Sequence, residues 1–241
     1  MSQGKIRLAL VGDGKMGREI ERLVKTDYQE SFDIVSIIDP ELSGNYYREI
    51  NKESVGQADV CIDFTRPDVV VDNTKKLVNL EKKIVVGTTG WYDRRAEVVD
   101  FVADASGILV YSPNFSFGVN AFLRAIKEGA KVLGLSPEFY YDLRETHHEE
   151  KKDKPSGTAK KMAQSLRDAG IRLSDEDITS IRIGNIIGDH SLRVDSPYET
   201  IELYHRAKNR LGYASGALFA ARWINNVDSG VYTMDEMLDD V

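Results

Sequence analysis

The first half of the chain alternates short apolar runs with stretches whose apolar residues recur at helical spacing. The apolar runs cover residues 6–12, 32–39, 59–65, 83–90 and 107–113. The stretches with a helical pattern include residues 15–26, 68–80 and 92–104. Continuous apolar strands separated by helices are typical of a parallel sheet that is covered on both faces. The sequence therefore predicts an α/β fold with a Rossmann-like, doubly wound parallel sheet.

The pattern changes in the second half of the chain. Helical spacing covers residues 119–133 and 156–169. Residues 178–209 predict antiparallel strands joined by turns, and the apolar stretch 211–227 predicts a further helix. No obvious linker separates the two halves, so we expect two lobes, of which the second is α+β.

The composition excludes several classes of protein. Of the 241 residues, 41% are hydrophobic and 29% are charged, which is typical of a globular protein. The net charge of −7 argues against general binding to nucleic acid or to an anionic membrane. The first apolar run is too short for a signal peptide or a membrane span, and the one cysteine, Cys61, lies in an apolar run where we expect a buried thiol. We therefore expect a cytoplasmic protein.

A glycine pattern follows the first predicted strand. Gly12, Gly14 and Gly17 form G-x-G-x-x-G at the start of the first predicted helix. In dinucleotide-binding folds the first glycine permits a tight turn, the second lets a pyrophosphate approach the backbone, and the third lets helix and strand pack closely. The pattern alone is weak, but Asp39 ends the second predicted strand where a ribose-binding carboxylate is expected. We therefore predict dinucleotide binding at this turn.

The residue at position 39 also bears on the choice of cofactor. A carboxylate accepts hydrogen bonds from ribose hydroxyls and repels a 2′-phosphate. Pro40 follows Asp39, and the next arginine is Arg48, so the sequence favours NADH over NADPH. A Gly/Thr turn at residues 87–90 would allow close approach of a ring or ribose, although an ordinary turn could have the same composition.

The stretch ETHHEEKKDKPSGTA gathers two adjacent histidines and several lysines just before a predicted helix. A serine or threonine can cap that helix, and the backbone N–H groups of its first turn would then face an incoming anion. The cationic side chains could add charge-assisted hydrogen bonds, and a histidine with a reference pKa of about 6.5 can act as a general acid at neutral pH. The residues of this candidate anion site are His147, His148, Lys151, Ser156, Gly157 and Thr158.

Three interpretations of this stretch compete. A metal site needs three or four converging ligands, but adjacent side chains in an extended run point to opposite sides. A solvated charged loop would need no ligand. A site for a carboxylate-bearing substrate uses both the cationic side chains and the helix start. The sequence favours the last interpretation, and we expect no metal.

The motifs resemble one protein family in their order along the chain. VGDGKMG, DFTRP, GTTGW, SPNFSFGVN, ETHHEEKKDKPSGTA, IIGDH and HRAKNRLGYASGAL occur as in the 4-hydroxy-tetrahydrodipicolinate reductase family, also called dihydrodipicolinate reductases. The resemblance covers nearly the whole chain, and its HHxxKxDxPSGTA block is highly specific. It implies a cytoplasmic homotetramer that uses NADH or NADPH in diaminopimelate and lysine biosynthesis.

The resemblance also implies a division of labour. A dinucleotide-binding domain of residues 1–118 plus 211–241 would be completed by the C-terminal tail. An inserted α+β domain of residues 119–210 would bind the substrate, a small cyclic imine with two carboxylates, and form the tetramer. The substrate would lose its 4-hydroxyl as water and receive a hydride at ring C4, and a side chain would protonate the resulting enamine.

Roles carried over by position fall into three sets. His147 resembles the family's proton donor, and Lys151 resembles its second donor and charge stabiliser. The substrate carboxylate would be held by His148, Lys151, Ser156, Gly157 and Thr158. The cofactor would be lined by Gly12, Gly14, Lys15, Met16, Gly17, Asp39, Phe64, Thr65, Gly87, Thr88, Thr89, Asn114, Phe115 and Arg210. Residues left open between substrate contact and structural role are Arg182, Gly184, His190 and His205, the last interpreted as structural.

The loop departs from the family pattern, and two rival functions remain. Lys152 and Lys154 make the loop more basic than usual, and Glu149 stands where a basic residue is common. A two-lobed amino-acid or sugar dehydrogenase would share the glycine pattern without needing the HHxxK and PSGT motifs together. A nucleotide-sensing protein would bind NADH without turnover.

Overall fold

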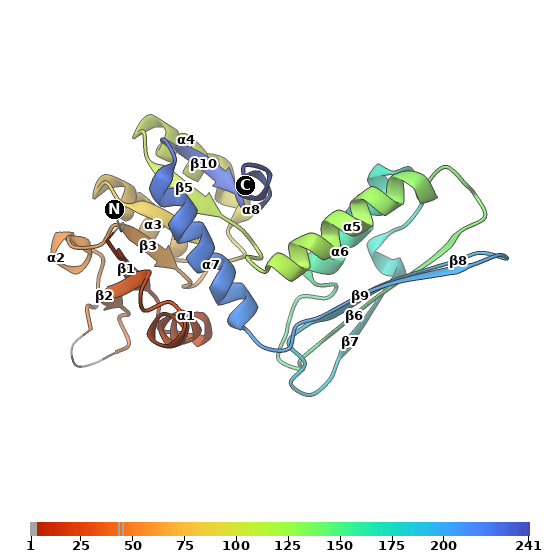
Figure 1. Cartoon of the computed structure of the whole chain (residues 1–241), viewed down its shortest axis with the longest axis horizontal. Coiled ribbons are helices and arrows are strands. Elements are labelled where there is room, and N and C mark those ends of the chain that lie inside the picture. The colour runs from red at the N-terminus through yellow and green to blue at the C-terminus, as the bar shows by residue number, and fades with distance from the viewer. Residues whose placement is uncertain (1–3, 43, 45) are drawn as a thin grey trace. The chain divides into compact units, whose positions relative to one another are not determined.

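The computed structural model describes residues 4–42, 44 and 46–241. The chain forms two compact units, each with its own sheet and core (Figure 1). Unit 1 contains Met1–Ser116 and Tyr213–Val241, and unit 2 contains Phe117–Gly212. These limits fall close to the expected domain limits at residues 118 and 210.

Unit 1 is built on a parallel sheet of six strands in the order β10-β5-β4-β3-β1-β2. The strands are β1 (Ile6–Val11), β2 (Phe32–Ile38), β3 (Val60–Asp63), β4 (Lys83–Val86), β5 (Ile108–Tyr111) and β10 (Gly230–Thr233). The chain adds β2 on one side of β1 and then continues from β3 on the other side. This reversal of the strand order creates a switch point. Sheets of this kind bind ligands at that point, just outside the carboxyl ends of the strands.

Helices cover both faces of this sheet (Figure 1). On one face, apolar residues of α2 (Lys52–Val55), α3 (Val70–Asn79) and α4 (Arg95–Asp104) pack against alternate strand residues. Figure 1 shows α1 (Lys15–Thr26) and α7 (Leu211–Trp223) on the other face. None of the helices in the described part of the chain is long and apolar enough to cross a membrane. The predicted doubly wound parallel sheet is confirmed.

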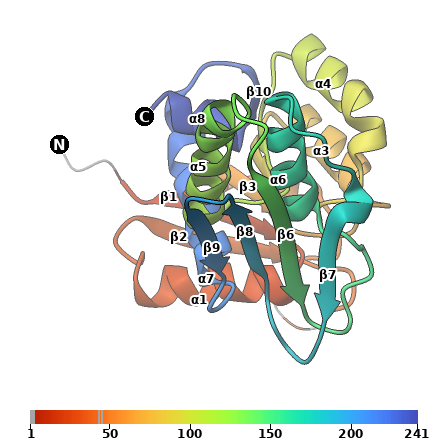
Figure 2. The same cartoon turned by 90° about the vertical axis from the view of Figure 1, so that its right-hand side faces the viewer.

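Unit 2 is a four-stranded sheet in the order β7-β6-β8-β9, with two helices against it (Figure 2). The elements are α5 (Phe117–Leu133), β6 (Tyr140–His147), α6 (Gly157–Asp168), β7 (Ile178–Arg182), β8 (Asp189–Asp195) and β9 (Thr200–Arg206). Phe122 and Ile126 of α5 and Met162 of α6 pack with Leu143 and Leu192 of the sheet in one apolar core. The core lies on one face of the sheet only, so the α+β expectation for this half is confirmed.

The prediction of antiparallel strands throughout residues 178–209 was wrong for β7, which pairs with β6 in parallel. The reason is the connection, because α6 links the two strands and a strand–helix–strand unit returns the chain in its original direction. β8 and β9 are antiparallel as predicted. The sequence also missed α2, β10 and α8 (Met234–Asp239), which are too short for a periodic pattern to stand out.

Helix α7 packs very close to the chain that follows β5, and Gly216 makes this possible. A Cβ atom at Gly216 would lie 1.7 Å from the carbonyl oxygen of Phe115. We expect Gly216→Ala to lower the free energy of unfolding by about 1–3 kcal/mol, because helix or loop must shift. The matched control is Gly129→Ala in α5, where the Cβ position is open and alanine should stabilise by up to about 1 kcal/mol. Equal changes in denaturant unfolding would contradict this packing.

Candidate functional site

The glycine turn needs glycine for packing at two of its three positions. Gly12 has φ +93°, and a Cβ atom there would lie 2.7 Å from the carbonyl oxygen of Phe64. A Cβ atom at Gly17 would lie 2.2 Å from the carbonyl oxygen of Gly12. Gly14 is exposed and caps α1 without a side-chain hydrogen bond, and its Cβ position has no other protein atom within 4 Å. Gly14 therefore leaves open space at a helix N-terminus, where a pyrophosphate would bind.

The carboxylate predicted to bind the ribose is oriented by main-chain donors. Oδ2 of Asp39 accepts a hydrogen bond from the N–H of Asp13 in the glycine turn at 2.9 Å. Oδ1 accepts one from the N–H of Glu41 at 2.9 Å. An ionised carboxylate has about four lone-pair sites, so both oxygens keep capacity for ribose hydroxyls. The side chain fixes the end of β2 to the glycine turn and can still take a ligand.

A buried carboxylate joins the loops that follow β3 and β4. Oδ1 of Asp63 accepts hydrogen bonds from the N–H and hydroxyl of Thr65 at 3.0 and 2.6 Å and from the hydroxyl of Thr88 at 2.9 Å. Oδ2 accepts one from the amide of Asn73 at 3.0 Å. Burial raises the pKa of the Asp63 carboxyl, and the four donors act in the opposite direction. Asp63 thereby holds two predicted cofactor residues in a fixed relation.

The predicted cofactor residues of unit 1 gather at the carboxyl edge of the sheet. The ring of Phe64 lies on Gly87, where a Cβ atom would be 2.0 Å from the ring. The ring of Phe115 lies edge-on to that of Phe64, with ring centroids 6.4 Å apart. Arg210 belongs to unit 2. The other predicted cofactor residues come after the strands of unit 1, namely after β1 (Gly12, Gly14, Lys15, Met16, Gly17), β2 (Asp39), β3 (Phe64, Thr65), β4 (Gly87, Thr88, Thr89) and β5 (Asn114, Phe115).

In unit 2, the covered face of the sheet changes from apolar to polar along β6. Leu143 lies in the apolar core. Two residues further along, Glu145 lies opposite His190 of β8, and after two more residues His147 lies opposite Arg182 of β7. Alternate residues of a strand share a face, so β6 presents a leucine, a carboxylate and an imidazole in succession on its covered side.

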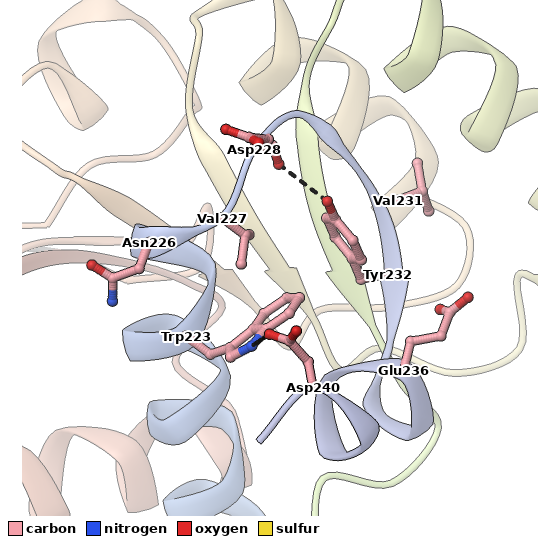
Figure 3. A pocket seen from close by; sticks show the side chains of 8 residues that line it. All are labelled: Trp223, Asn226, Val227, Asp228, Val231, Tyr232, Glu236 and Asp240. Atoms are coloured by element: carbon pink, nitrogen blue, oxygen red, sulfur yellow. Dashed lines mark hydrogen bonds between the residues drawn. The ribbon is translucent and has the colours of Figure 1, made fainter.

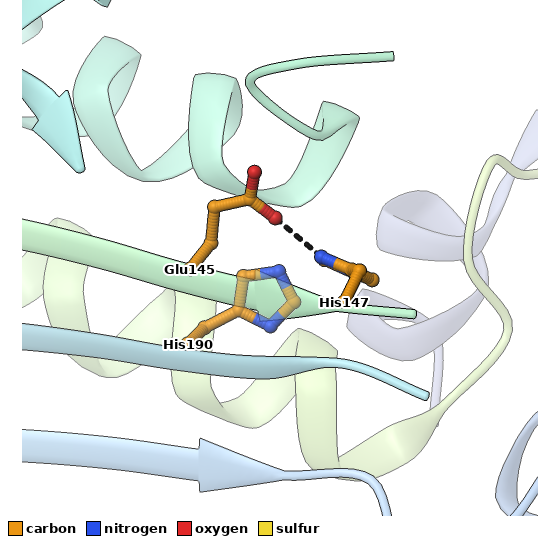
Figure 4. A group of neighbouring side chains, drawn as sticks. All are labelled: Glu145, His147 and His190. Atoms are coloured by element: carbon orange, nitrogen blue, oxygen red, sulfur yellow. Dashed lines mark hydrogen bonds and ion pairs between the residues drawn. The ribbon is translucent and has the colours of Figure 1, made fainter. Parts of the chain in front are cut away.

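Glu145 is the centre of a buried hydrogen-bonded group (Figure 4). Its side chain is 0% exposed, and its Oε2 pairs with Nδ1 of His147. Oε1 accepts hydrogen bonds from Nη2 of Arg182 at 2.8 Å and from the N–H of Ser156 at 3.3 Å. Burial alone would raise the pKa of the Glu145 carboxyl, but hydrogen bonds from His147 and Arg182 hold that pKa well below its usual range. Because an ionised carboxylate can only accept, Nδ1 of His147 carries a proton.

The other ring nitrogen of His147 faces a position without a side chain. A Cβ atom at Gly188 would lie 3.0 Å from Nε2, which is tighter than an ordinary contact, so glycine is the residue that fits beside this nitrogen without a shift. The ring of His190 lies edge-on to that of His147, with centroids 5.1 Å apart. Burial, and then the neighbouring His147, lower the pKa of His190 to about 3, so His190 is neutral. His147 therefore has a carboxylate on one nitrogen and the backbone of Gly188 next to the other.

Glu145, His147 and His190 have potential ligand atoms within 4.8 Å of one another, a spacing that could also hold a metal ion (Figure 4). Sequence reasoning considered the adjacent histidines, whereas this group uses alternate positions of one strand and a neighbouring strand. Both carboxylate oxygens already accept hydrogen bonds, one of them from the guanidinium of Arg182. That cation disfavours a second one, so the donor set fits an oriented histidine better than a metal site.

The start of α6 has the features predicted for an anion site. The hydroxyl of Ser156 accepts a hydrogen bond from the helix N–H three residues on at 3.2 Å, and it lies 3.3 Å from Nε2 of His190. Gly157 is exposed, and its Cβ position has no protein atom within 4 Å. Thr158 is half-buried in the same turn. The helix start is capped and open at Gly157, which permits close approach of an anion.

The loop before α6 carries the predicted lysine and is tied to the sheet. The ammonium of Lys151 is 2.7 Å from the carboxylate of Asp153, and the lysine side chain is 24% exposed. The guanidinium of Arg182 donates hydrogen bonds to the main-chain carbonyls of Lys151 at 3.2 Å and Asp153 at 2.5 Å. His148 follows His147 directly and is half-buried. All six predicted catalytic and substrate residues thus belong to the end of β6, this loop and the first turn of α6.

A separate hollow in unit 1 has the wrong charge for binding an anion (Figure 3). The residues that line it are Trp223, Asn226, Val227, Asp228, Val231, Tyr232, Glu236 and Asp240. Three of these eight carry carboxylates and none is cationic, so a dicarboxylate or a pyrophosphate would be repelled. None of the predicted site residues is among them.

The structure predicts that Asp63→Ala loosens the carboxyl edge of unit 1. Its hydrogen-bond donors would be left buried without their acceptor, at about 1–3 kcal/mol for each one that finds no other partner. We expect a lower free energy of unfolding and weaker NADH binding in a fluorescence titration. Asp59→Ala, at the other end of β3, is the control, because its exposed pair with Arg7 is worth about 1 kcal/mol or less. Matching effects of the two changes would contradict the role of Asp63.

Two family models together match most of the chain. The model described as dihydrodipicolinate reductase, N-terminus, matches residues 6–115, and the model described as dihydrodipicolinate reductase, C-terminus, matches residues 118–238. The 4-hydroxy-tetrahydrodipicolinate reductase of Methanopyrus kandleri is 32% identical over 265 residues, covering 96% of this chain and 95% of that protein. The enzyme of the same name from Christiangramia forsetii is 31% identical, covering 98% and 99%.

A solved structure agrees with the fold. The dipicolinate-bound dihydrodipicolinate reductase from Paenisporosarcina sp. TG-14 superposes with a TM-score of 0.75 at 22% identity, covering 95% of this chain and 97% of that one. The family models and relatives confirm the predicted oxidoreductase class and the NAD(P)-binding, Rossmann-like domain. The chain belongs to the dihydrodipicolinate reductase family, the 4-hydroxy-tetrahydrodipicolinate reductases of diaminopimelate and lysine biosynthesis.

Proposed function

We propose that this chain reduces 4-hydroxy-tetrahydrodipicolinate to tetrahydrodipicolinate, with the cofactor bound by unit 1 and the dicarboxylate substrate by unit 2. The observation that carries the proposal is the histidine of β6, which has an ionised carboxylate on one ring nitrogen and a capped, open helix start nearby in the same unit. A nucleotide-sensing protein would need no such group.

One substrate carboxylate binds at the start of α6 in this proposal. The backbone N–H groups of Gly157 and Thr158 face it, and the positive end of the helix stabilises its charge. His148 and Lys151 add charge-assisted hydrogen bonds. For Lys151 this means exchanging the carboxylate of Asp153 for that of the substrate, which is a modest change because the present pair is partly exposed.

The proton comes from His147, with Lys151 as the second donor. When bound, the reduced nicotinamide supplies the hydride for C4 of the ring that remains after loss of the 4-hydroxyl as water. Hydride addition leaves an enamine, which needs one proton to give tetrahydrodipicolinate. Protonated His147 donates it from Nε2, because Nδ1 is held by Glu145 and Nε2 is the ring nitrogen that remains for the substrate.

We propose that NADH is the preferred cofactor. Asp39 is held at the end of β2, with Pro40 and Glu41 after it, so the ribose position is acidic. The exposed guanidinium of Arg66 lies 3.7 Å from Glu41 and 3.4 Å from Asp68, and its charge is partly neutralised. A 2′-phosphate would meet these carboxylates at a cost, whereas ribose hydroxyls can donate to Asp39.

We also propose that the chain works in the cytoplasm as a homotetramer joined through the uncovered face of the unit 2 sheet. That face exposes Ile181 and Tyr204, with relative exposures of 43% and 55%. It also carries oppositely charged neighbours, Arg193 and Glu202, at 3.6 Å. Such a mixed face can pair with a second copy of itself about a two-fold axis.

The function is tested with freshly prepared 4-hydroxy-tetrahydrodipicolinate and each cofactor. We expect oxidation of NADH that depends on the substrate, with kcat/KM for NADH above that for NADPH because Asp39 repels the 2′-phosphate. The measurement is the fall in absorbance of the reduced nicotinamide. Cofactor binding without substrate-dependent oxidation would overturn the function, and a strong preference for NADPH would overturn the assignment of Asp39.

The role of Lys151 is tested by Lys151→Ala. Hydrogen bonds to charged groups are worth about 1.5–3 kcal/mol, so kcat/KM should fall by about ten- to several-hundred-fold. Lys152→Ala is the matched control, since it removes the same charge from the next, exposed position of the loop. Steady-state kinetics of the two variants should differ by at least about tenfold in kcat/KM. Near-full activity of Lys151→Ala would contradict its role.

A further inference from the structure

The two oxygens of Glu145 divide their partners in a way that distinguishes them chemically. Oε1 faces two donors, the guanidinium of Arg182 and the N–H of Ser156. Oε2 pairs with Nδ1 of His147. Neither a guanidinium nor a peptide N–H can accept a hydrogen bond, so the side-chain atom that faces Arg182 and Ser156 must be an acceptor. Nδ1 of His147 carries a proton only if the atom that faces it, Oε2 in Glu145, is an acceptor as well.

Arg182 connects this carboxylate to the loop that carries Lys151. Its guanidinium donates to Glu145 and also to the main-chain carbonyls of Lys151 and Asp153, so one side chain spans the sheet and the loop. The parallel pairing of β6 and β7 places Arg182 opposite His147, with its side chain only 13% exposed. A planar guanidinium with fixed donor directions can hold three oxygens at once, which an ammonium does less well.

We propose that Glu145 and Arg182 act together as positioning residues for both proton donors. Glu145 fixes His147 with Nδ1 protonated and Nε2 directed to the substrate, and Arg182 holds the main chain of Lys151 at the same end of the sheet. This extends the proposed function, on which it rests for the catalytic roles of His147 and Lys151. Neither positioning residue needs to touch the substrate.

The surroundings support a single arrangement of the imidazole. Glu145 is fully buried and its pKa is held low, so the carboxylate stays charged. His190 lies against the ring, but it is neutral and its Nε2 faces the hydroxyl of Ser156. Gly188 lies beside Nε2 and brings no side chain there. The imidazole therefore has its one strong acceptor on the Nδ1 side.

Glu145→Gln tests the first half of the proposal. The substituted amide oxygen must face Arg182 and Ser156, which only donate, so the amide N–H is directed to Nδ1 of His147. Nδ1 then becomes an acceptor, and neutral His147 carries its proton on Nε2 instead. In ¹⁵N NMR of the full-length protein we expect neutral His147 to change from the Nδ1–H to the Nε2–H tautomer. We expect kcat to fall by at least about tenfold, because general acid catalysis contributes about 10²–10⁴-fold, while KM for the substrate changes little.

Arg182 is tested by Arg182→Met and the conservative Arg182→Lys. Loss of the guanidinium releases the main chain at Lys151, so kcat should fall and KM should rise. Lysine can keep the ion pair with Glu145 without holding both carbonyls, so it should restore kcat more than KM. Identical kinetic parameters for methionine, lysine and wild type would overturn the role of Arg182. A lysine variant that restores KM but not kcat would overturn it as well.

The control is Asp175→Asn, which removes a carboxylate from the exposed pair with Arg167 in the same unit. It should leave kcat, KM and the His147 tautomer unchanged.

If Glu145→Gln does not fold, Glu145→Asp keeps the charge but withdraws the carboxylate, and the same loss of kcat is expected. An unchanged tautomer, or a kcat within twofold of wild type, overturns the proposal for Glu145. The NMR measurement needs no turnover, so it separates this outcome from a wild-type chain that fails to reduce the substrate.

Discussion

The pairing of the buried Glu145 carboxylate is the interaction on which the candidate site of unit 2 depends. A charge with no exposed surface is costly unless it is fully paired, and here it is paired by an imidazole, a guanidinium and a peptide N–H. Each of these partners comes from a different segment, namely β6 itself, β7 and the start of α6. The sheet and the helix start are therefore held to one another by the same two oxygens, and Arg182 extends this link to the loop before α6.

Unit 1 uses a buried carboxylate for a similar purpose. Asp63 sits at the end of β3 and holds the loops after β3 and β4, while the half-buried Asp39 holds the glycine turn to the end of β2. In both units, strand ends supply rigid anchors and carboxylates organise the loops that follow them. Sites built in this way are preorganised, so less orientation is left to be achieved when a ligand binds.

Much of the fold follows from local pattern, and the rest depends on pairing between distant strands. Apolar runs and glycine spacing predicted the parallel sheet of unit 1 and its ligand edge. Periodicity does not encode strand direction, which is why β7 was assigned wrongly, and the four residues of β10 are too few to show a pattern. His147 and Lys151 were predicted as site residues from a local motif. Glu145 was missed because its partner Arg182 lies 37 residues away, and only the register of β6 and β7 brings them together.

The most direct measurement is a crystal structure of the full chain with pyridine-2,6-dicarboxylate, a stable dicarboxylate of the same ring type as the substrate. We predict one carboxylate on the N–H groups of Gly157 and Thr158, with Lys151 released from Asp153 to bind it and the ring beside Nε2 of His147. A dicarboxylate bound away from the start of α6, or one that leaves Nε2 of His147 without contact, would contradict the assignment of this site.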